Sequence, residues 1–421
     1  MRSLPRPRPL PLAAAVLALA AVPAVPAVAV GAPADHRPDH RPDGERPAAA
    51  PTLLARATLS ATLYLPGPPS GAALGSAPIN GVTPPFPGQP IPGFSGVLAT
   101  RGGDVLGLAD NGFGSKANSA DYLLQLDRVR PRWRTRAGGE GSVRVIAPIR
   151  LSDPARRVPF PIVREGRQLT GADFDIESLQ PGRAGSFWIG DEFGPYLLQV
   201  DGRGRLLRAP IPLPGVRSPQ SAEVAAGAPA TLPASGGFEA MAALPGGRTL
   251  LPITEKALTG DGDQQRRLIH EFDVRRARYT GRTWSYRTEL PTTLVADAQA
   301  LDRQRLLVLE RDDFEGAKAL VKKLFVVDLR RTNPDGSLVK TEVADLLRLR
   351  DPGVTVATPG SFGLGDPFSF ALQSVESVLP LGGGRVLVAN DNNFPFSNGR
   401  VAGRPDDTEL IVVDVPALRE R

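Results

Sequence analysis

The stretch ESVLPLGGGRVLVANDNN, residues 376–393, decides the predicted fold of this 421-residue chain. An apolar strand leads into a glycine-rich turn, and a second apolar strand ends in acidic and amide side chains. Gly382 to Gly384 stand where a tight hairpin needs positive φ angles. We therefore expect a β-hairpin whose two outer ends meet at one edge of a sheet.

The same hairpin pattern, with a glycine-rich or charge-rich turn, occurs four more times. These units are SGVLATRGGDVLGLADN (95–111), ESLQPGRAGSFWIGDE (177–192), EAMAALPGGRTLLPITEK (239–256) and AQALDRQRLLVLERD (298–312). A third apolar strand ending in a charged turn follows each hairpin, as in YLLQVDGRG at residues 196–204. Hairpins with an outer strand, repeated every 60 to 80 residues or so, are typical of propeller blades.

The predicted fold is all-β: a single β-propeller of about six blades of antiparallel strands. Five units are clear, and a degenerate sixth is expected near Ser142–Pro148 or Tyr279–Pro291. The strand at 410–415 is expected to close the ring against a strand near 58–65. A β-sandwich is the competing architecture, but it has no reason to place glutamate at one fixed point of successive hairpins.

The N-terminus has the features of an export signal. Arg2, Arg6 and Arg8 precede an apolar run from residue 10 to 30, and Ala32-Pro33-Ala34 is a small-x-small cleavage site. We expect a signal peptide at 1–34, a disordered Pro-rich linker at 35–51 and the propeller domain at 52–421. The protein would then be secreted, after cleavage near Ala34, with no stable membrane anchor.

Composition excludes several classes of function. The chain has no cysteine, so disulfides and thiolate chemistry are absent. Its net charge of +6 includes three arginines of the predicted signal. The sequence has no stripe of basic residues, so it gives no support to nucleic-acid binding. No P-loop, serine elbow or zinc-protease motif occurs. The expected partner is a small molecule rather than a nucleic acid, and the expected oligomeric state is a monomer.

Acidic residues recur at two points of the repeat. Glu177, Glu239 and Glu376 begin a first strand, and a second strand ends at Asp110, Asp191, Glu192, Glu255, Glu310 and Asp391. The rotation that relates propeller blades would bring these residues together. Carboxylates held close together repel unless a counter-charge is present, and oxygen ligands favour calcium. The alternative is that these acids cap turns and pair with arginines on the rim.

These positions define the candidate site. The candidate calcium ligands are Glu177, Asp191, Glu192, Glu239, Glu255, Glu310, Glu376 and Asp391, and either Glu239 or Glu177 is the candidate catalytic base. Arginine holds phosphate oxygens with a planar fork. The candidate substrate-binding residues are Arg311, Lys256, Arg101 and Asn392.

Several motifs together resemble one known family. They are DFDIESL (173–179), WIGDEFGPYLLQVD (188–201), GFEAMAAL (237–244), ITEKAL (253–258), LLVLERDDFEG (306–316) and VESVLPL (375–381) followed by VANDNNFPFSNGR (388–400). Their order resembles the phytase-like family, described as having the esterase-like activity of phytase. The resemblance spans residues 57–415. It implies a propeller with a central calcium-dependent site that hydrolyses ester bonds, phosphate esters above all.

The resemblance carries over to Glu177, Asp191, Glu192, Glu239, Glu255, Glu310, Arg311, Glu376, Asp391 and Asn392. The units that begin at Ser95 and Ala298 lack the first-strand glutamate, so the acidic ring is incomplete. The leading hypothesis is a secreted calcium-assisted ester hydrolase. The alternatives are a propeller lactonase or sugar-ester hydrolase, and a non-catalytic binding propeller that calcium stabilises.

Overall fold

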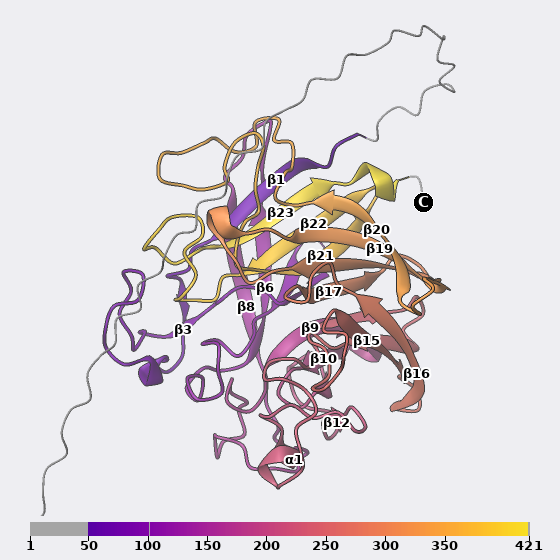
Figure 1. The fold of residues 1–421 in the computed structure, drawn as a ribbon. Coiled ribbons are helices and arrows are strands. Elements are labelled where there is room, and N and C mark those ends of the chain that lie inside the picture. Colours follow the sequence, from indigo (N-terminus) through magenta and orange to yellow (C-terminus); the bar gives the residue numbers. More distant parts are fainter. Residues whose placement is uncertain (1–48, 101, 420–421) are drawn as a thin grey trace, which may run out of the picture. The chain divides into compact units, whose positions relative to one another are not determined.

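The computed structural model describes residues 49–100 and 102–419, which are almost entirely strands, turns and loops (Figure 1). The predicted signal peptide and the linker as far as residue 48 lie outside the described residues. Among the described residues, the only α-helix is α1 (Ala222–Ala225), and the 3-10 turns are Ala72–Leu74, Arg183–Gly185, Gly316–Lys318 and Pro416–Leu418. None of these helices has the length and apolar character needed to cross a membrane.

Three sheets have four strands each, and a nine-stranded sheet contains two more groups of four; we call these five groups blades 1 to 5. Blade 1 contains β4 (Gly96–Ala99), β5 (Val105–Leu108), β6 (Gln125–Arg132) and β8 (Ser142–Arg150). Blade 2 contains β9 (Ile176–Pro181), β10 (Phe187–Asp191), β11 (Tyr196–Val200) and β12 (Ile211–Pro212). Blade 3 contains β13 (Ala240–Ala243), β14 (Thr249–Ile253), β15 (Arg266–Asp273) and β16 (Arg278–Arg287).

Blade 4 contains β17 (Leu294–Ala300), β18 (Arg305–Arg311), β19 (Lys322–Thr332) and β20 (Leu338–Asp345). Blade 5 contains β21 (Ser374–Gly382), β22 (Arg385–Asp391), β23 (Thr408–Asp414) and, from the other end of the chain, β1 (Thr52–Leu59). The short strands β2 (Tyr64–Leu65) and β3 (Gln89–Pro90) pair with each other, and β7 (Arg134–Thr135) pairs with β1.

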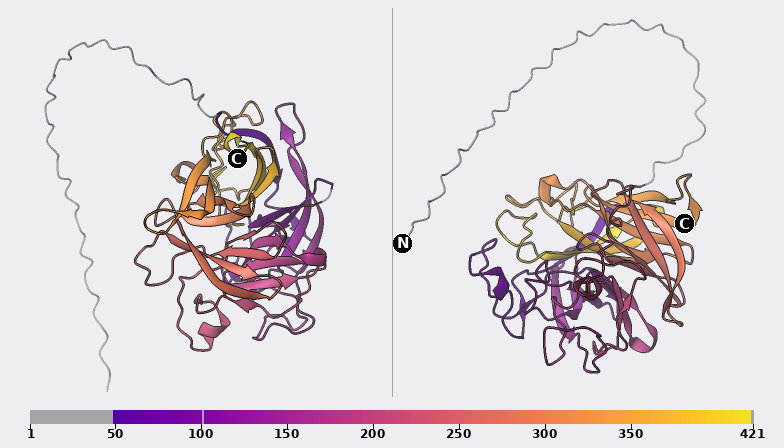
Figure 2. Two further views of the ribbon diagram at one scale, coloured as in Figure 1. Left: turned by 90° about the vertical axis from the view of Figure 1, so that its right-hand side faces the viewer. Right: turned by 60° about the horizontal axis from the view of Figure 1, so that its bottom comes forward.

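The first strands of the blades form a closed ring. β4 contacts β9, β9 contacts β13, β13 contacts β17, β17 contacts β21, and β21 contacts β4 again. Figure 2 shows the blades arranged about this ring. The predicted β-propeller is therefore confirmed.

The expected number of about six blades is wrong, because the ring has five. The segments proposed as a sixth blade belong to existing ones. Residues 142–148 lie within β8 and residues 279–287 within β16, and each of these strands is the fourth of its blade. β8 also makes a short parallel pairing with β1, at Ser142 and Thr58. The repeat therefore contains four strands, and the fourth has a weak apolar pattern because one of its faces is exposed.

Blade 5 is closed by the two ends of the domain. β1 pairs antiparallel with β23, from Thr52 opposite Asp414 to Leu59 opposite Thr408. Every second residue of β1 is buried, as expected of a strand with one face against the core. The expected closure by the C-terminal strand is confirmed, although its partner is residues 52–59 rather than 58–65.

Apolar clusters fill the spaces between blades. Trp188 of blade 2 contacts Phe272 of blade 3 edge-on, with ring centroids 5.4 Å apart. Between blades 4 and 5, aliphatic residues of both faces form one buried cluster that includes Leu307, Leu309 and Val388. This packing fixes the blades against one another and so fixes the strand ends that carry the acidic side chains.

Candidate functional site

The first strands of blades 2 and 5 each carry a glutamate at a β-bulge. The ladder register shifts at Glu177 and at Glu376, so neither residue has a partner opposite it. Such bulges re-aim a side chain at the edge of a sheet. Blade 4 has the same bulge, with Ala296 in it. Ala296, rather than the expected Ala298, is thus the counterpart of these glutamates.

The second strands supply the other half of the site. Ile176, Val295 and Val375 precede the three bulges and pair with Asp191, Glu310 and Asn390. The residues that directly follow these three partners, Glu192, Arg311 and Asp391, therefore occupy equivalent positions in their blades. Across blades 1 to 5 the residues at the strand ends are Asp110, Glu192, Glu255, Arg311 and Asp391. Blade 4 therefore places an arginine where the other four blades place a carboxyl group.

These side chains meet in what we call the axial cluster. In each of three groups of acidic residues, one carboxylate oxygen per residue lies within 4.8 Å of those of the other two. The groups are Asp110, Asp175 and Glu177; Glu177, Glu239 and Glu376; and Glu192, Glu239 and Glu255. With Asp391, whose pKa responds to the charge of Asp110, the cluster has eight carboxyl groups. All eight side chains belong to buried residues, none more than 9% exposed.

Arg311 lies among these acids. Its Nη2 atom is 2.7 Å from Glu376 Oε1 and 3.5 Å from one oxygen of both Glu239 and Glu255. Its Nη1 atom pairs with Asp313. Burial alone would lower the pKa of Arg311, but the surrounding carboxylates outweigh it and raise that pKa. The arginine is therefore a permanent positive charge inside the cluster.

Burial and mutual repulsion raise the pKa values of the acids. For Glu177 the main cause is burial, followed by the charge of Glu239, and for Glu239 it is burial followed by the charge of Glu376. Burial also raises the pKa of Asp175 to about 6. One guanidinium group is thus too little positive charge for all of these acids to ionise together at neutral pH.

Two buried oxygen atoms of the cluster have no hydrogen-bond or ion-pair partner. They are Oε1 of Glu192 and Oε2 of Glu376. A buried polar atom is normally paired, because leaving it unpaired costs about 1–3 kcal/mol. Carboxylate oxygens are the ligands of hard divalent cations. The donor set and its free oxygens therefore fit a cation such as calcium.

Two expected ligands lie outside the axial cluster. Asp191 Oδ1 and Oδ2 accept hydrogen bonds from the backbone N–H groups of Asp175 and Gly194, at 2.8 and 2.7 Å. The Glu310 carboxylate binds the Tyr286 hydroxyl and Lys340 between blades 3 and 4. Each of these acids comes one residue before a cluster position, and successive strand residues point to opposite faces.

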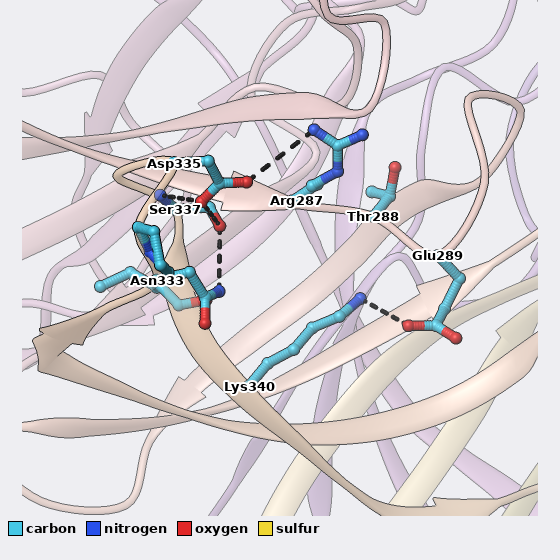
Figure 3. Close-up of a pocket in the computed structure, with 9 residues that line it drawn as sticks. Arg287, Thr288, Glu289, Asn333, Asp335, Ser337 and Lys340 are labelled. Carbon is cyan, nitrogen blue, oxygen red and sulfur yellow. Dashed lines mark hydrogen bonds and ion pairs between the residues drawn. The ribbon is translucent and has the colours of Figure 1, made fainter.

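Lys340 also lines a cavity of about 490 Å³ at the outer strands of blades 3 and 4 (Figure 3). There its Nζ atom lies 2.9 Å from Glu289 Oε1, while Arg287 pairs with Asp263 at 2.7 Å. Lys340 thus pairs with both Glu289 and Glu310, so Glu310 balances the charge of a lysine between blades 3 and 4.

Of the four expected substrate-binding residues, three lie in the described part of the chain, and Arg311 is the one within the axial cluster. Lys256 lies at the edge of the cluster, with Nζ 3.0 Å from Glu255 Oε2 and bonded to the carbonyl oxygens of Ala234 and Ser235. Asn392 is 1% exposed, and its side chain is used in bonds to Thr408 and to the backbone of residue 394. Arg101 lies outside the described residues.

Asp175 is a member of the cluster that the repeat pattern missed. It precedes the bulge residue Glu177 by two positions, and its Oδ1 atom accepts a hydrogen bond of 2.7 Å from Asn111 Nδ2. No other blade has an acid at this position, so comparison between repeats did not reveal it. The alternating acids of DFDIE, at 173, 175 and 177, were the available signal.

A closed ring of four-stranded blades around a buried acidic cluster defines a five-bladed β-propeller with an axial site. The family model for "Phytase-like: Esterase-like activity of phytase" matches residues 89–394. The chain belongs to this phytase-like family.

Other similarities are more distant. An uncharacterized secreted protein of Arthroderma benhamiae is 27% identical over 146 residues, which are 31% of this chain and 28% of that protein. The chain thus matches well under two thirds of that relative.

Among solved structures, a calcium-binding protein, regucalcin, from Agrobacterium tumefaciens has a TM-score of 0.36 at 11% identity, covering 76% of this chain and 90% of that one. An aldose sugar dehydrogenase from Streptomyces coelicolor has a TM-score of 0.33 at 11% identity, covering 87% and 99%. Likeness at this level says nothing about the chemistry of the axial cluster.

Proposed function

We propose that this protein is a secreted ester hydrolase that works with calcium at the axial cluster. The observation that carries the proposal is the gathering of eight buried carboxyl groups around Arg311, with carboxylate oxygens left unpaired. Membership of a family described by esterase-like activity supports the same reaction class. The expected partner is a small-molecule ester, bound by a monomer.

Glu239 is the best candidate for the catalytic base. Glu239 belongs to two of the three groups of neighbouring acidic residues and also contacts Arg311, so it lies in the middle of the cluster. Glu177 likewise belongs to two of these groups. A bound calcium ion would supply the positive charge that keeps these carboxylates ionised and would polarise the ester oxygen. Arg311 contacts both Glu376 and Glu239, so it helps to fix the positions of these two carboxyl groups.

A hydrolysis assay with a matched pair of variants tests this function. Glu239→Gln keeps the shape of the side chain and removes its charge, so we expect a folded protein with weaker calcium binding and at least about 100-fold lower turnover. Glu310→Gln changes the same residue type outside the axial cluster and should retain calcium binding. Equal activity and calcium affinity in Glu239→Gln and the wild type would contradict the assignment.

A binding propeller stabilised by calcium is the second candidate, and the burial of all eight carboxyl residues favours it. In that case calcium should raise the melting temperature while neither carboxylic esters nor phosphate esters are cleaved. Calcium-dependent hydrolysis that chelation abolishes would exclude this candidate. Intact mass of the protein from culture medium tests export separately, since a mature chain beginning near residue 35 is expected.

A further inference from the structure

A cavity formed by residues of blades 2 and 3 is lined mainly by charged side chains, and we call it the basic cavity. Its volume is about 730 Å³, which lies within the range of about 300–1,000 Å³ typical of small-molecule sites. Five arginines line it: Arg183, Arg208, Arg248, Arg275 and Arg276. Glu271 and Asp273 are the acidic residues of the lining, so positive charges outnumber negative ones by three.

The basic cavity lies at the opposite ends of the strands from the axial cluster. Arg183 lies in the turn between β9 and β10, and Arg275 lies in the turn between β15 and β16. Arg248 directly precedes β14, in the turn after β13. Glu192 of the axial cluster directly follows β10, whose five residues span roughly 15 Å at about 3.3 Å per residue. The two sites are therefore separate, and one small molecule cannot occupy both.

The acids of the lining do not neutralise its arginines. Asp273 pairs with Arg276 at 3.5 Å. Glu271 pairs at 3.8 Å with Arg282, an arginine outside the lining. Within residues 49–100 and 102–419, no ion pair or side-chain hydrogen bond engages the guanidinium groups of the other four lining arginines. These four groups are therefore able to bind an anion without giving up a protein partner.

Arg208 is the arginine whose surroundings most favour a bound anion. It is half-buried, whereas the other four lining arginines are exposed. Its Nε atom is buried without a hydrogen-bond partner, and its Cζ atom lies 5.5 Å from the ring centre of Trp188. Partial removal of a cation from water is unfavourable without a counter-charge, and an aromatic ring offsets only part of this cost. A bound anion would supply the negative charge that the neighbouring protein groups do not.

From these observations we infer that the basic cavity binds a small molecule that carries several phosphate groups. A guanidinium group matches two phosphate oxygens with its planar fork, and four unengaged arginines can hold more than one phosphate group. The inference goes beyond the proposed hydrolase function, because binding here requires neither calcium nor the axial cluster. The arginines come from four separate segments of the chain, so the sequence shows no basic stripe.

Titration calorimetry of the protein in EDTA tests this inference, with tripolyphosphate and inorganic phosphate as the probes. EDTA removes calcium, which could otherwise hold a phosphate at the axial cluster. We expect one tripolyphosphate per chain, bound at least about tenfold more tightly than inorganic phosphate, because each further phosphate group meets another arginine. Raising the salt concentration should weaken this binding. Equal affinities for the two probes would overturn the inference.

A pair of exposed arginines allows the site to be mapped without disturbing the core. Arg248→Gln and Arg275→Gln should each weaken tripolyphosphate binding by at least about fivefold, with unchanged circular dichroism and Tm. Arg303→Gln is the matched control, since Arg303 is an exposed arginine in the turn between β17 and β18 and does not line the basic cavity. It should bind tripolyphosphate as the wild type does.

Three results would each contradict the assignment. Wild-type affinity in both Arg248→Gln and Arg275→Gln would remove the basic cavity as the binding site. Loss of tripolyphosphate binding in Glu239→Gln would place the ligand at the axial cluster instead. Tighter binding of single-stranded DNA than of tripolyphosphate would show that the preferred ligand is a polymer rather than a small molecule.

Discussion

Replacing Glu409 by glutamine should weaken the closure of the ring. Glu409 lies on β23 and is 1% exposed. Arg56 of β1 donates from Nε and Nη2 to its two oxygens at 2.9 Å each, and Arg400 donates from Nε and Nη2 at 2.7 and 3.0 Å. Glutamine keeps the shape but turns one acceptor oxygen into a donor. Two guanidinium groups then share a site without a negative charge.

The size of the effect follows from this geometry. Removing one partner of a buried ion pair costs about 3–5 kcal/mol. The Arg56 side chain is 22% exposed, so water replaces part of the lost interaction, and we expect a loss of about 3 kcal/mol. With an unfolding entropy of roughly 2.1 cal/mol/K per residue over roughly 370 residues, Tm should fall by about 4 °C.

The same carboxylate makes the effect depend on pH. Burial alone would raise the pKa of Glu409, but the charges and hydrogen bonds of Arg400 and Arg56 hold it well below its usual range. A carboxyl group with a lowered pKa in the folded state stabilises the fold above its unfolded pKa, and loses this effect as pH falls. The Tm difference between the wild type and Glu409→Gln should therefore be full at pH 7 and shrink below about pH 4.5.

Scanning calorimetry from pH 3 to 7 measures both effects. Asp414→Asn is the control, since Asp414 lies on the same strand and pairs at 2.6 Å with Arg419, whose side chain is 55% exposed. Its Tm should change by less than about 1 °C, as expected for a surface pair. The reasoning would be refuted if Glu409→Gln had the same Tm as the wild type at pH 7, or if its Tm were lower by the same amount at pH 3.5 and pH 7.

Three further predictions concern the axial cluster. Calcium at a hundredfold excess over its dissociation constant should stabilise the fold by about 2.7 kcal/mol, which a chelator reverses. Without calcium, Tm should fall as pH rises from 5 to 8, because burial raises the pKa values of Asp110, Glu177 and Glu239. Bound calcium should reduce this dependence of Tm on pH. Equal slopes of Tm against pH with and without calcium would contradict the prediction. Gly93→Ala should lower Tm and calcium affinity together, by about 3 kcal/mol in stability, because a Cβ there would lie 2.3 Å from Asp391 Cα at a φ of +131°. Gly102→Ala, with a φ of +85° and no atom within 4 Å, isolates the backbone strain, and normal calcium binding by Gly93→Ala would refute the contact argument.

The hairpins were predictable because both strands of each are mostly buried and are joined by a glycine-rich or charged turn. The number of blades was not, since the outer strands have mixed patterns. In β16 most residues are exposed or half-buried, so it looked like part of an extra blade rather than an edge. Closure between β1 and β23 was predictable in kind, because a ring needs a partner for its last strand. Its register depends on packing that the sequence pattern alone does not reveal.

The acidic positions of the site were predictable to within one residue. The repeat identified the ends of the second strands, but Asp191 and Glu192, or Glu310 and Arg311, are adjacent and point in opposite directions. Which member of each pair enters the cluster is set by the bulges at Glu177 and Ala296, and a bulge leaves no reliable mark in the sequence. Asp175 was missed because it has no counterpart in the other blades.

The pairing of β1 with β23 joins segments about 350 residues apart, and this has a consequence for biosynthesis. During translation β1 emerges first and must wait, with an unpaired edge, until the chain has been made as far as Asp414. Blades 1 to 4 can form in order behind it, whereas blade 5 can form only when synthesis of the domain is almost complete. Long-range pairing of this kind is slow, and an unpaired strand is prone to aggregate. A nascent chain truncated before residue 408 should therefore depend on a chaperone that covers this one strand.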